Sequence, residues 1–62
     1  MNYHKITLQD CLSVANTIEK IRLSMISDMP LLKSLAKKWC NSNGYKLGGY
    51  LGNEKWDATR KA

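Results

Sequence analysis

The chain has 62 residues, of which 10 are lysine or arginine and 5 are aspartate or glutamate, so its formal net charge is +5. Hydrophobic residues make up 44% and charged residues 24%, a balance typical of globular rather than disordered proteins. A domain of this size buries only about 60% of the surface that its unfolded chain exposes. We therefore expect one small domain over residues 1–62, and this size disfavours an enzyme with an enclosed pocket, a multidomain protein and a solenoid.

Targeting and cysteine usage point to the cytoplasm. No apolar run approaches the roughly 18 residues of a membrane span, and Gln9 and Asp10 interrupt what would have to be the core of a signal peptide. Two cysteines, Cys11 and Cys40, are too few for the disulfide framework of a small secreted protein. We expect reduced, mostly buried thiols, with an intrachain or intermolecular disulfide as the alternative, and no contact with a membrane.

A long amphipathic segment predicts a first helix over about residues 8–26. Thr7 suits its N-cap, and Asp10 suits the third position of a capping box. Apolar residues cover an arc of the helical wheel that is wider than the stripe needed against one neighbour, so we expect this helix to be covered from two directions. Glu19 and Arg22 project from within the apolar arc. They predict either an ion pair at its rim or an interface anchored by Arg22.

The sequence Ser27-Asp28-Met29-Pro30 predicts a break and then a second helix over about residues 30–42. Pro30 fits the first turn of a helix, and Gly44 supplies the left-handed residue that closes one. Because the connection is short, the two helices should form an antiparallel hairpin. We expect a mainly α fold. The Gly- and Tyr-rich C-terminal segment would pack on the hairpin as a small turn at Gly48-Gly49 or as a short third helix.

Residues for catalysis are scarce. The single histidine, His4, lies near a terminus, and the carboxylates are scattered in sequence. No spacing predicts a metal site, and the glycines fit neither a P-loop nor a dinucleotide-binding fingerprint. We therefore expect a protein that is not an enzyme and that holds no metal or cofactor.

The distribution of charge is the most informative feature of the sequence. Residues 1–28 carry no net charge, whereas residues 29–53 carry four lysines and no acid. Cationic side chains beside aromatic ones attract phosphates and stack on bases. The expected binding residues are Lys33, Lys37, Lys38, Lys46, Tyr45 and Tyr50.

These features favour a small regulatory protein that contacts nucleic acid, of the kind frequent among phage and mobile-element accessory proteins. The alternative is an inhibitor or adaptor that docks on an acidic surface of a larger host protein. The candidate residues for a protein interface are Arg22, Trp56, Ile18 and Met25, whereas Trp39 is expected in the core. Because the chain is short and its first helix is broadly apolar, we also expect self-association through this helix, as a dimer or a higher oligomer, with a dimer favoured.

Overall fold

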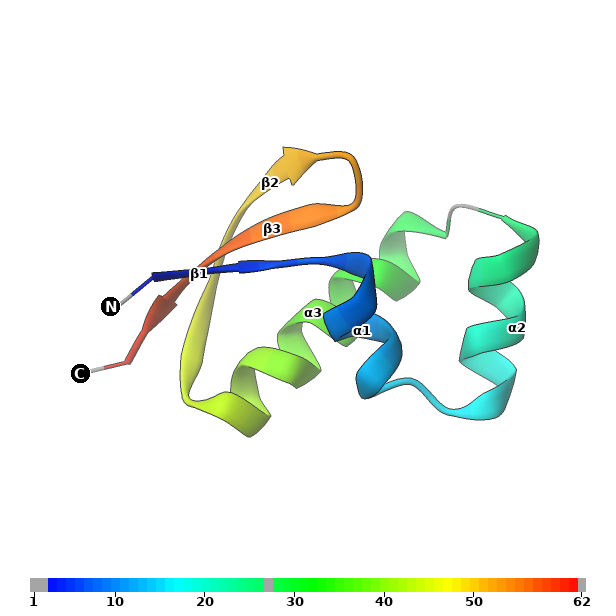
Figure 1. Cartoon of the computed structure of the whole chain (residues 1–62), viewed down its shortest axis with the longest axis horizontal. Helices are drawn as coiled ribbons and strands as arrows, with labels where there is room; N and C mark the ends of the chain where they lie inside the picture. Colours follow the sequence, from blue (N-terminus) through cyan, green and yellow to red (C-terminus); the bar gives the residue numbers. More distant parts are fainter. Residues whose placement is uncertain (1–2, 27, 62) are drawn as a thin grey trace.

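The computed structural model of the chain describes residues 3–26 and 28–61, which form three strands and three helices (Figure 1). A short first strand is followed by the three helices and then by two longer strands. The elements are β1 Tyr3–Ile6, α1 Leu8–Ser13, α2 Thr17–Met25, α3 Met29–Asn43, β2 Tyr45–Gly52 and β3 Lys55–Arg60.

The strands form one antiparallel sheet in the order β1-β3-β2, and this sheet makes the fold α+β. The expectation of a mainly α helical hairpin is therefore wrong. β1 pairs with β3 from Tyr3 opposite Thr59 to Ile6 opposite Trp56. The first and last segments of the chain thus lie side by side. No local pattern in the sequence indicates this pairing, because its partners are about fifty residues apart.

The β2–β3 hairpin turns at Asn53 and Glu54, whose φ angles are 51° and 59°. Positive φ at both central residues is the backbone of a type I′ turn, which suits the twist of a hairpin. The turn is therefore not at Gly48-Gly49, which lies inside β2 where the register with β3 shifts. The short third helix expected near the C-terminus is also wrong, since β3 occupies that segment.

The first expected helix, over residues 8–26, is in fact two helices. The helix α1 begins with the capping box of Thr7 and Asp10, as expected, but it ends at Ser13. A second capping box then starts α2: Asn16 Oδ1 accepts from the Glu19 amide at 2.8 Å, and Glu19 Oε1 accepts from the Asn16 amide at 2.9 Å. The helical spacing of apolar residues continues through this break, so periodicity alone predicts one helix where the structure has two.

The helix α3 confirms the second expected helix and both of its end signals. Asp28 caps it by accepting from the Leu31 amide, and Pro30 occupies its first turn. Gly44 closes it in the left-handed conformation, with φ of 72°. The neighbours of α3 differ from the expected ones, because it packs on α1 and on β2 rather than along an antiparallel partner helix.

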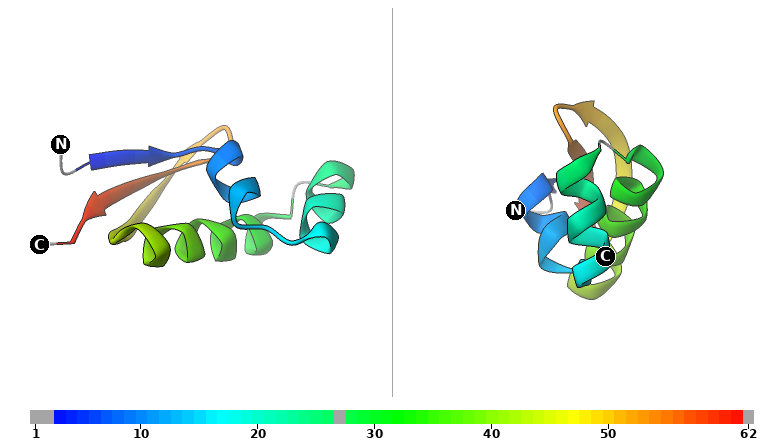
Figure 2. Two further views of the ribbon diagram at one scale, coloured as in Figure 1. Left: turned by 60° about the horizontal axis from the view of Figure 1, so that its bottom comes forward. Right: turned by 90° about the vertical axis from the view of Figure 1, so that its right-hand side faces the viewer.

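The core lies between α3 and the sheet, with α1 closing one side (Figure 2). Small and aliphatic side chains dominate it, and Trp56 is its largest member. The buried residues are Ile6, Cys11, Leu31, Leu32, Leu35, Ala36, Cys40, Trp56 and Ala58. The expectations for the two tryptophans are therefore wrong. Trp56 is in the core, whereas Trp39 is only partly buried at the edge of the core.

The molecule is elongated, with extents of 36 × 21 × 16 Å. Both chain ends lie at one pole of the long axis, and α2 lies at the other (Figure 1). The amide of Lys61 donates to the carbonyl of Gly44 at 2.9 Å, which ties the last described residue to the corner between α3 and β2. Among the described helices, none is long and apolar enough to cross a membrane.

Candidate binding site on α3 and β2

The solvent-facing side of α3 carries three exposed lysines, Lys33, Lys37 and Lys38. The opposite side of the helix supplies five of the buried core residues. Lys33 and Lys37 are four residues apart and therefore lie one above the other on the helix surface. We call these three residues the α3 lysine face.

Among the described residues, no carboxylate is paired with a lysine of the α3 lysine face. Within residues 3–26 and 28–61, the ion pairs are His4 with Asp10 and Arg22 with Asp28, and neither includes a lysine. Asp10 and Asp28 also serve as caps at helix N-termini. The lysine ammonium groups are thus left to interact with solvent or with an anionic partner.

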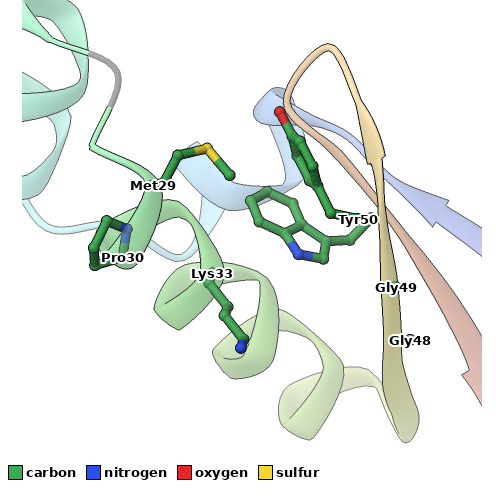
Figure 3. A pocket seen from close by; sticks show the side chains of 7 residues that line it. Met29, Pro30, Lys33, Gly48, Gly49 and Tyr50 are labelled. Atoms are coloured by element: carbon green, nitrogen blue, oxygen red, sulfur yellow. The ribbon is translucent and has the colours of Figure 1, made fainter.

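A groove of about 520 Å³ lies between the N-terminal half of α3 and strand β2 (Figure 3). Its walls are largely apolar, and Lys33 supplies its charged group. The lining residues are Met29, Pro30, Lys33, Gly48, Gly49, Tyr50 and Trp56. The α3 lysine face and the groove therefore share Lys33 and form one continuous candidate site.

Tyr50 is held rigidly at the edge of the groove. Its hydroxyl accepts a hydrogen bond from the Glu54 amide at 3.0 Å, and its ring packs against Trp56 with a centroid distance of 4.7 Å. The residue nevertheless remains 47% exposed. A fixed and accessible aromatic ring loses little freedom when a flat ligand stacks on it.

Gly48 and Gly49 form the β2 wall of the groove, and a side chain at the first of them would be crowded by the backbone of β3. A Cβ atom at Gly48 would lie 3.1 Å from the carbonyl oxygen of Asp57 on β3. The space around Gly49 is open. The glycine pair therefore keeps this wall low where it faces Lys33, which leaves the groove accessible.

The structure separates two of the residues expected in this site from the others. Lys46 is exposed on β2, but Leu47 and its partner Ala58 turn toward the core, so alternation places Lys46 on the outer face of the sheet. Tyr45 packs at the end of the molecule away from the groove. Of the expected residues, the fold brings Lys33 and Tyr50 together in the groove. Lys37 lies one turn along α3 from Lys33, and Lys38 is exposed on α3 but does not line the groove.

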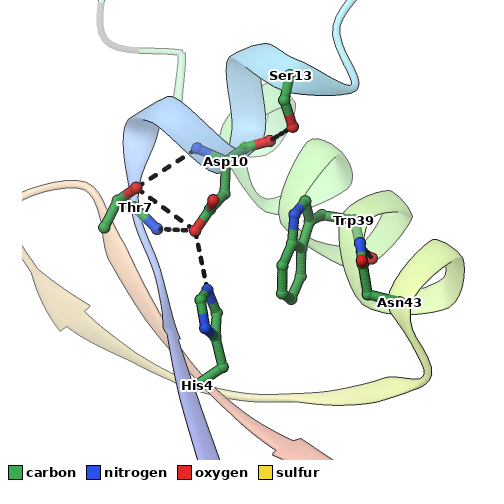
Figure 4. Close-up of polar contacts among 6 residues, drawn as sticks. All are labelled: His4, Thr7, Asp10, Ser13, Trp39 and Asn43. Atoms are coloured by element: carbon green, nitrogen blue, oxygen red, sulfur yellow. Dashed lines mark hydrogen bonds and ion pairs between the residues drawn. The ribbon is translucent and has the colours of Figure 1, made fainter.

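Tyr45 belongs to an aromatic cluster with His4 and Trp39 that joins β1, α3 and β2. Figure 4 shows two of its members, His4 and Trp39. The His4 ring stacks on Trp39 at a centroid distance of 4.6 Å, and its Nε2 lies 3.0 Å from Asp10 Oδ2. Asp10 Oδ2 also accepts from the Thr7 amide at 3.1 Å. His4 therefore acts as a link between β1 and the start of α1.

The residues expected at a protein interface are also separated from one another. Ile18 and Met25 are exposed on α2, whereas Trp56 is only 3% exposed and is unavailable as a surface anchor. Its ring was expected outside because the surrounding glycines suggested a loose tail. Arg22 pairs with Asp28, because Glu19 is engaged in capping α2. The expected Glu19–Arg22 pair is therefore wrong.

The described residues offer little for covalent chemistry. No group of three histidine, cysteine or acidic residues among them could hold a metal ion. Both cysteines are free and buried. Burial raises the pKa of the Cys11 thiol to about 11, with the nearby Asp10 charge adding to the effect, and burial also raises the pKa of Cys40. Protonated, buried thiols are poor nucleophiles.

Sequence reasoning missed Met29, Pro30, Gly48 and Gly49 as parts of the site. Pro30 was interpreted as a helix start and the glycines as a turn, and their meeting across the groove depends on the packing of α3 on β2. Comparisons with protein-family models, with curated proteins and with solved structures find no significant match. Function is therefore inferred from the residues and geometry of this chain.

Proposed function

We propose that this chain is a small, non-enzymatic regulator that binds nucleic acid through the α3 lysine face and Tyr50. The observation that carries the proposal is that Lys33 lines a groove edged by a fixed, exposed tyrosine ring. Lys37 and Lys38 are exposed on the same helix, and none of the three lysines is paired with a carboxylate among the described residues. Phosphates would pair with Lys33, Lys37 and Lys38, and an unpaired base would stack on Tyr50.

The proposed contact reads little sequence. Lysine is a flexible point charge that suits phosphate contact, whereas base edges are read mainly by arginine, asparagine and glutamine. The α3 lysine face carries no arginine, and Arg22 is engaged with Asp28. We therefore expect similar affinity for unrelated sequences of the same length.

The test is the dependence of binding on salt. Each phosphate contact to duplex DNA contributes about 0.9 to the slope of log K against log salt concentration. Replacing Lys33 and Lys37 by glutamine should flatten that slope by up to about 1.8 and weaken binding at low salt. Fluorescence anisotropy with a labelled oligonucleotide between low and moderate salt measures both quantities.

A matched variant separates local contact from net charge. Lys5→Gln with Lys55→Gln removes the same two charges from exposed positions on the sheet, away from α3. This variant should keep the slope of the unmodified chain. Equal slopes for the two double variants would show that the α3 lysine face is not the contact.

Tyr50 is tested with single-stranded DNA. Stacking of a base on an aromatic side chain contributes about 1–3 kcal/mol, so Tyr50→Ala should weaken single-strand binding by about tenfold and duplex binding by less. Tyr50→Phe keeps the ring and should bind like the unmodified chain. A circular dichroism spectrum checks that each variant is folded. Equal single-strand affinity for Tyr50→Ala would remove stacking from the proposal.

The second candidate function is an adaptor or inhibitor that docks on an acidic protein surface. The observation that favours it is the apolar character of the groove, where Met29, Pro30 and Tyr50 offer the kind of pocket that anchors a protein side chain. Absence of binding to both single-stranded and duplex DNA and RNA at low salt would favour this function over the first.

A cytoplasmic location belongs to the same proposal. Two free, buried cysteines are typical of proteins that work in a reducing compartment. Fractionation of cells that produce the tagged chain tests this location, and recovery in an extracytoplasmic fraction would contradict it.

A further inference from the structure

The helix α2 exposes a narrow apolar stripe. Ile18, Ile21 and Met25 follow the spacing i, i+3, i+7 that places side chains on one side of a helix, and Ile26 follows directly. Their exposed fractions are 70%, 54%, 76% and 61%. We call these four residues the α2 stripe. It contains four of the eight large hydrophobic residues exposed in the described part of the chain.

The rest of the molecule gives α2 little support. None of its nine residues is buried, and Leu23 is its one hydrophobic side chain packed against the core. A helix this short is marginal in water without tertiary packing. The capping box at Asn16 and the ion pair between Arg22 and Asp28 fix its ends, and Ile18, Ile21 and Met25 remain more than half exposed. The stripe is therefore a surface that lacks a packing partner within residues 3–26 and 28–61.

Charge favours a second copy of the chain as the partner. Copies with a net charge of +5 repel each other, and the repulsion is smallest where opposite charges balance locally. The α2 stripe is such a place, since Arg22, four residues after Ile18 on the same side of α2, is paired with Asp28. A nucleic acid or an acidic protein would instead be drawn to the α3 lysine face, because residues 29–53 contain no acid.

We propose that two copies associate through the α2 stripe about a two-fold axis, with the two α2 helices antiparallel. Ile21 lies in the middle of the stripe and would meet its own copy, while Ile18 would meet Met25 of the second copy. The position of α2 at the pole opposite the chain ends gives a second copy access to it (Figure 1). The groove and the α3 lysine face would stay open.

The experiment is sedimentation of the chain alone at concentrations from about 1 to 500 µM, without nucleic acid. The 7.1 kDa chain should approach twice that mass as concentration rises, in the micromolar range expected of a small interface. Raising the salt concentration should strengthen association, because it screens the repulsion between the two copies. A mass of one chain at all concentrations would overturn the proposal.

Two matched variants locate the contact. Ile18→Ser with Met25→Ser changes side chains that the single chain leaves exposed, so the fold should persist and the mass should fall to that of one chain. Leu51→Ser changes an exposed hydrophobic residue on β2 and should leave association unchanged. Loss of association in Leu51→Ser, or its persistence in the double variant, would place the contact elsewhere.

A cross-link tests the two-fold arrangement. Ile21→Cys should form a disulfide between copies on mild oxidation, seen as a band of twice the mass on a non-reducing gel. The same change at Leu51 should give none, and the native cysteines are buried and stay unreacted. Equal cross-linking from both positions would contradict the arrangement.

The experiments distinguish failure of the dimer proposal from failure of the nucleic-acid-binding proposal. The dimer is measured in the absence of nucleic acid and is expected to strengthen with salt, whereas nucleic-acid binding is expected to weaken with salt.

Discussion

The thiol of Cys11 is fully buried between α1 and α3, and its sulfur lies 3.8 Å from the carbonyl oxygen of Leu32. Removing it from water disfavours the thiolate, and this is the main reason why its pKa rises to about 11. A buried thiol of this kind stabilises the fold only while it keeps its proton.

Stability should therefore fall at alkaline pH in a defined window. The unfolded thiol loses its proton near pH 9, whereas the folded one holds it to about pH 11. The contribution of Cys11 is fully present below pH 9 and is lost as pH rises toward 11, a change of roughly 2–3 kcal/mol. Urea unfolding at pH 7, 9 and 11 measures it.

Cys11→Ala is the control for that window. The pKa of Tyr3 is also raised, because of a hydrogen bond to the Asp57 carboxylate. Measurements on the unmodified chain alone therefore cannot separate the contribution of Cys11 from that of Tyr3. The loss of stability between pH 9 and 11 should be smaller in Cys11→Ala by the amount stated above. Equal losses in both proteins would show that Cys11 does not titrate in this window.

Among the elements, the β2–β3 hairpin contains a turn residue whose backbone conformation lowers the stability of the fold. Glu54 occupies the left-handed region with φ of 59°, where residues other than glycine, asparagine and aspartate are disfavoured. Asn followed by Gly is the preferred pair for this turn type. Glu54→Gly should therefore stabilise the fold, by up to about 1 kcal/mol, as measured by urea unfolding. Asn53→Ala, which removes the residue best suited to this conformation, should destabilise it.

The two N-terminal capping boxes should differ in their global importance. Thr7→Ala removes the cap of α1, whose Cys11 is in the core, and should lower the free energy of unfolding by about 1 kcal/mol. Asn16→Ala removes the cap of α2, which contributes no buried residue. It should lower the hydrogen-exchange protection of α2 by about fivefold while global stability changes little. Equal global losses would contradict the weak attachment of α2.

The helix ends show what local sequence can predict. Unpaired backbone N–H and C=O groups at a helix end are either hydrogen-bonded by a capping residue or absent, and residues of this kind are Thr7, Asp28, Pro30 and Gly44. Such signals predict the bounds of α3 to within one residue. The start of α2 carries a signal of the same kind in Asn16 and Glu19. It was overlooked because the apolar period runs on through the break.

The sheet shows what local sequence cannot predict. The turn at Asn53-Glu54 contains no glycine, although most tight hairpin turns do. The pair Gly48-Gly49 has the sequence of a hairpin turn but lies inside β2. The burial of Trp56 depends on β3 pairing with β1 across nearly the whole chain. The groove likewise exists because this sheet packs on α3, so the lysines of the candidate site were predicted and its shape was not.

At the scale of the whole molecule, the weak support of α2 predicts that its protection depends on concentration. Amides of α2 should exchange faster than those of α3 in dilute solution and should slow as concentration rises. The exchange rates of α3 should change less. Mass spectrometry of deuterium uptake at two concentrations tests this. Protection of α2 that is independent of concentration would argue against assembly through the α2 stripe.

Both chain ends lie together at the pole farthest from α2. A fluorescent protein or affinity handle attached at either end should therefore leave α2 free to meet its copy. In the assembled pair the handles would stand at the two tips of a rod. Dyes placed there would be too far apart for efficient energy transfer, while a dye pair near α2 would report pairing directly.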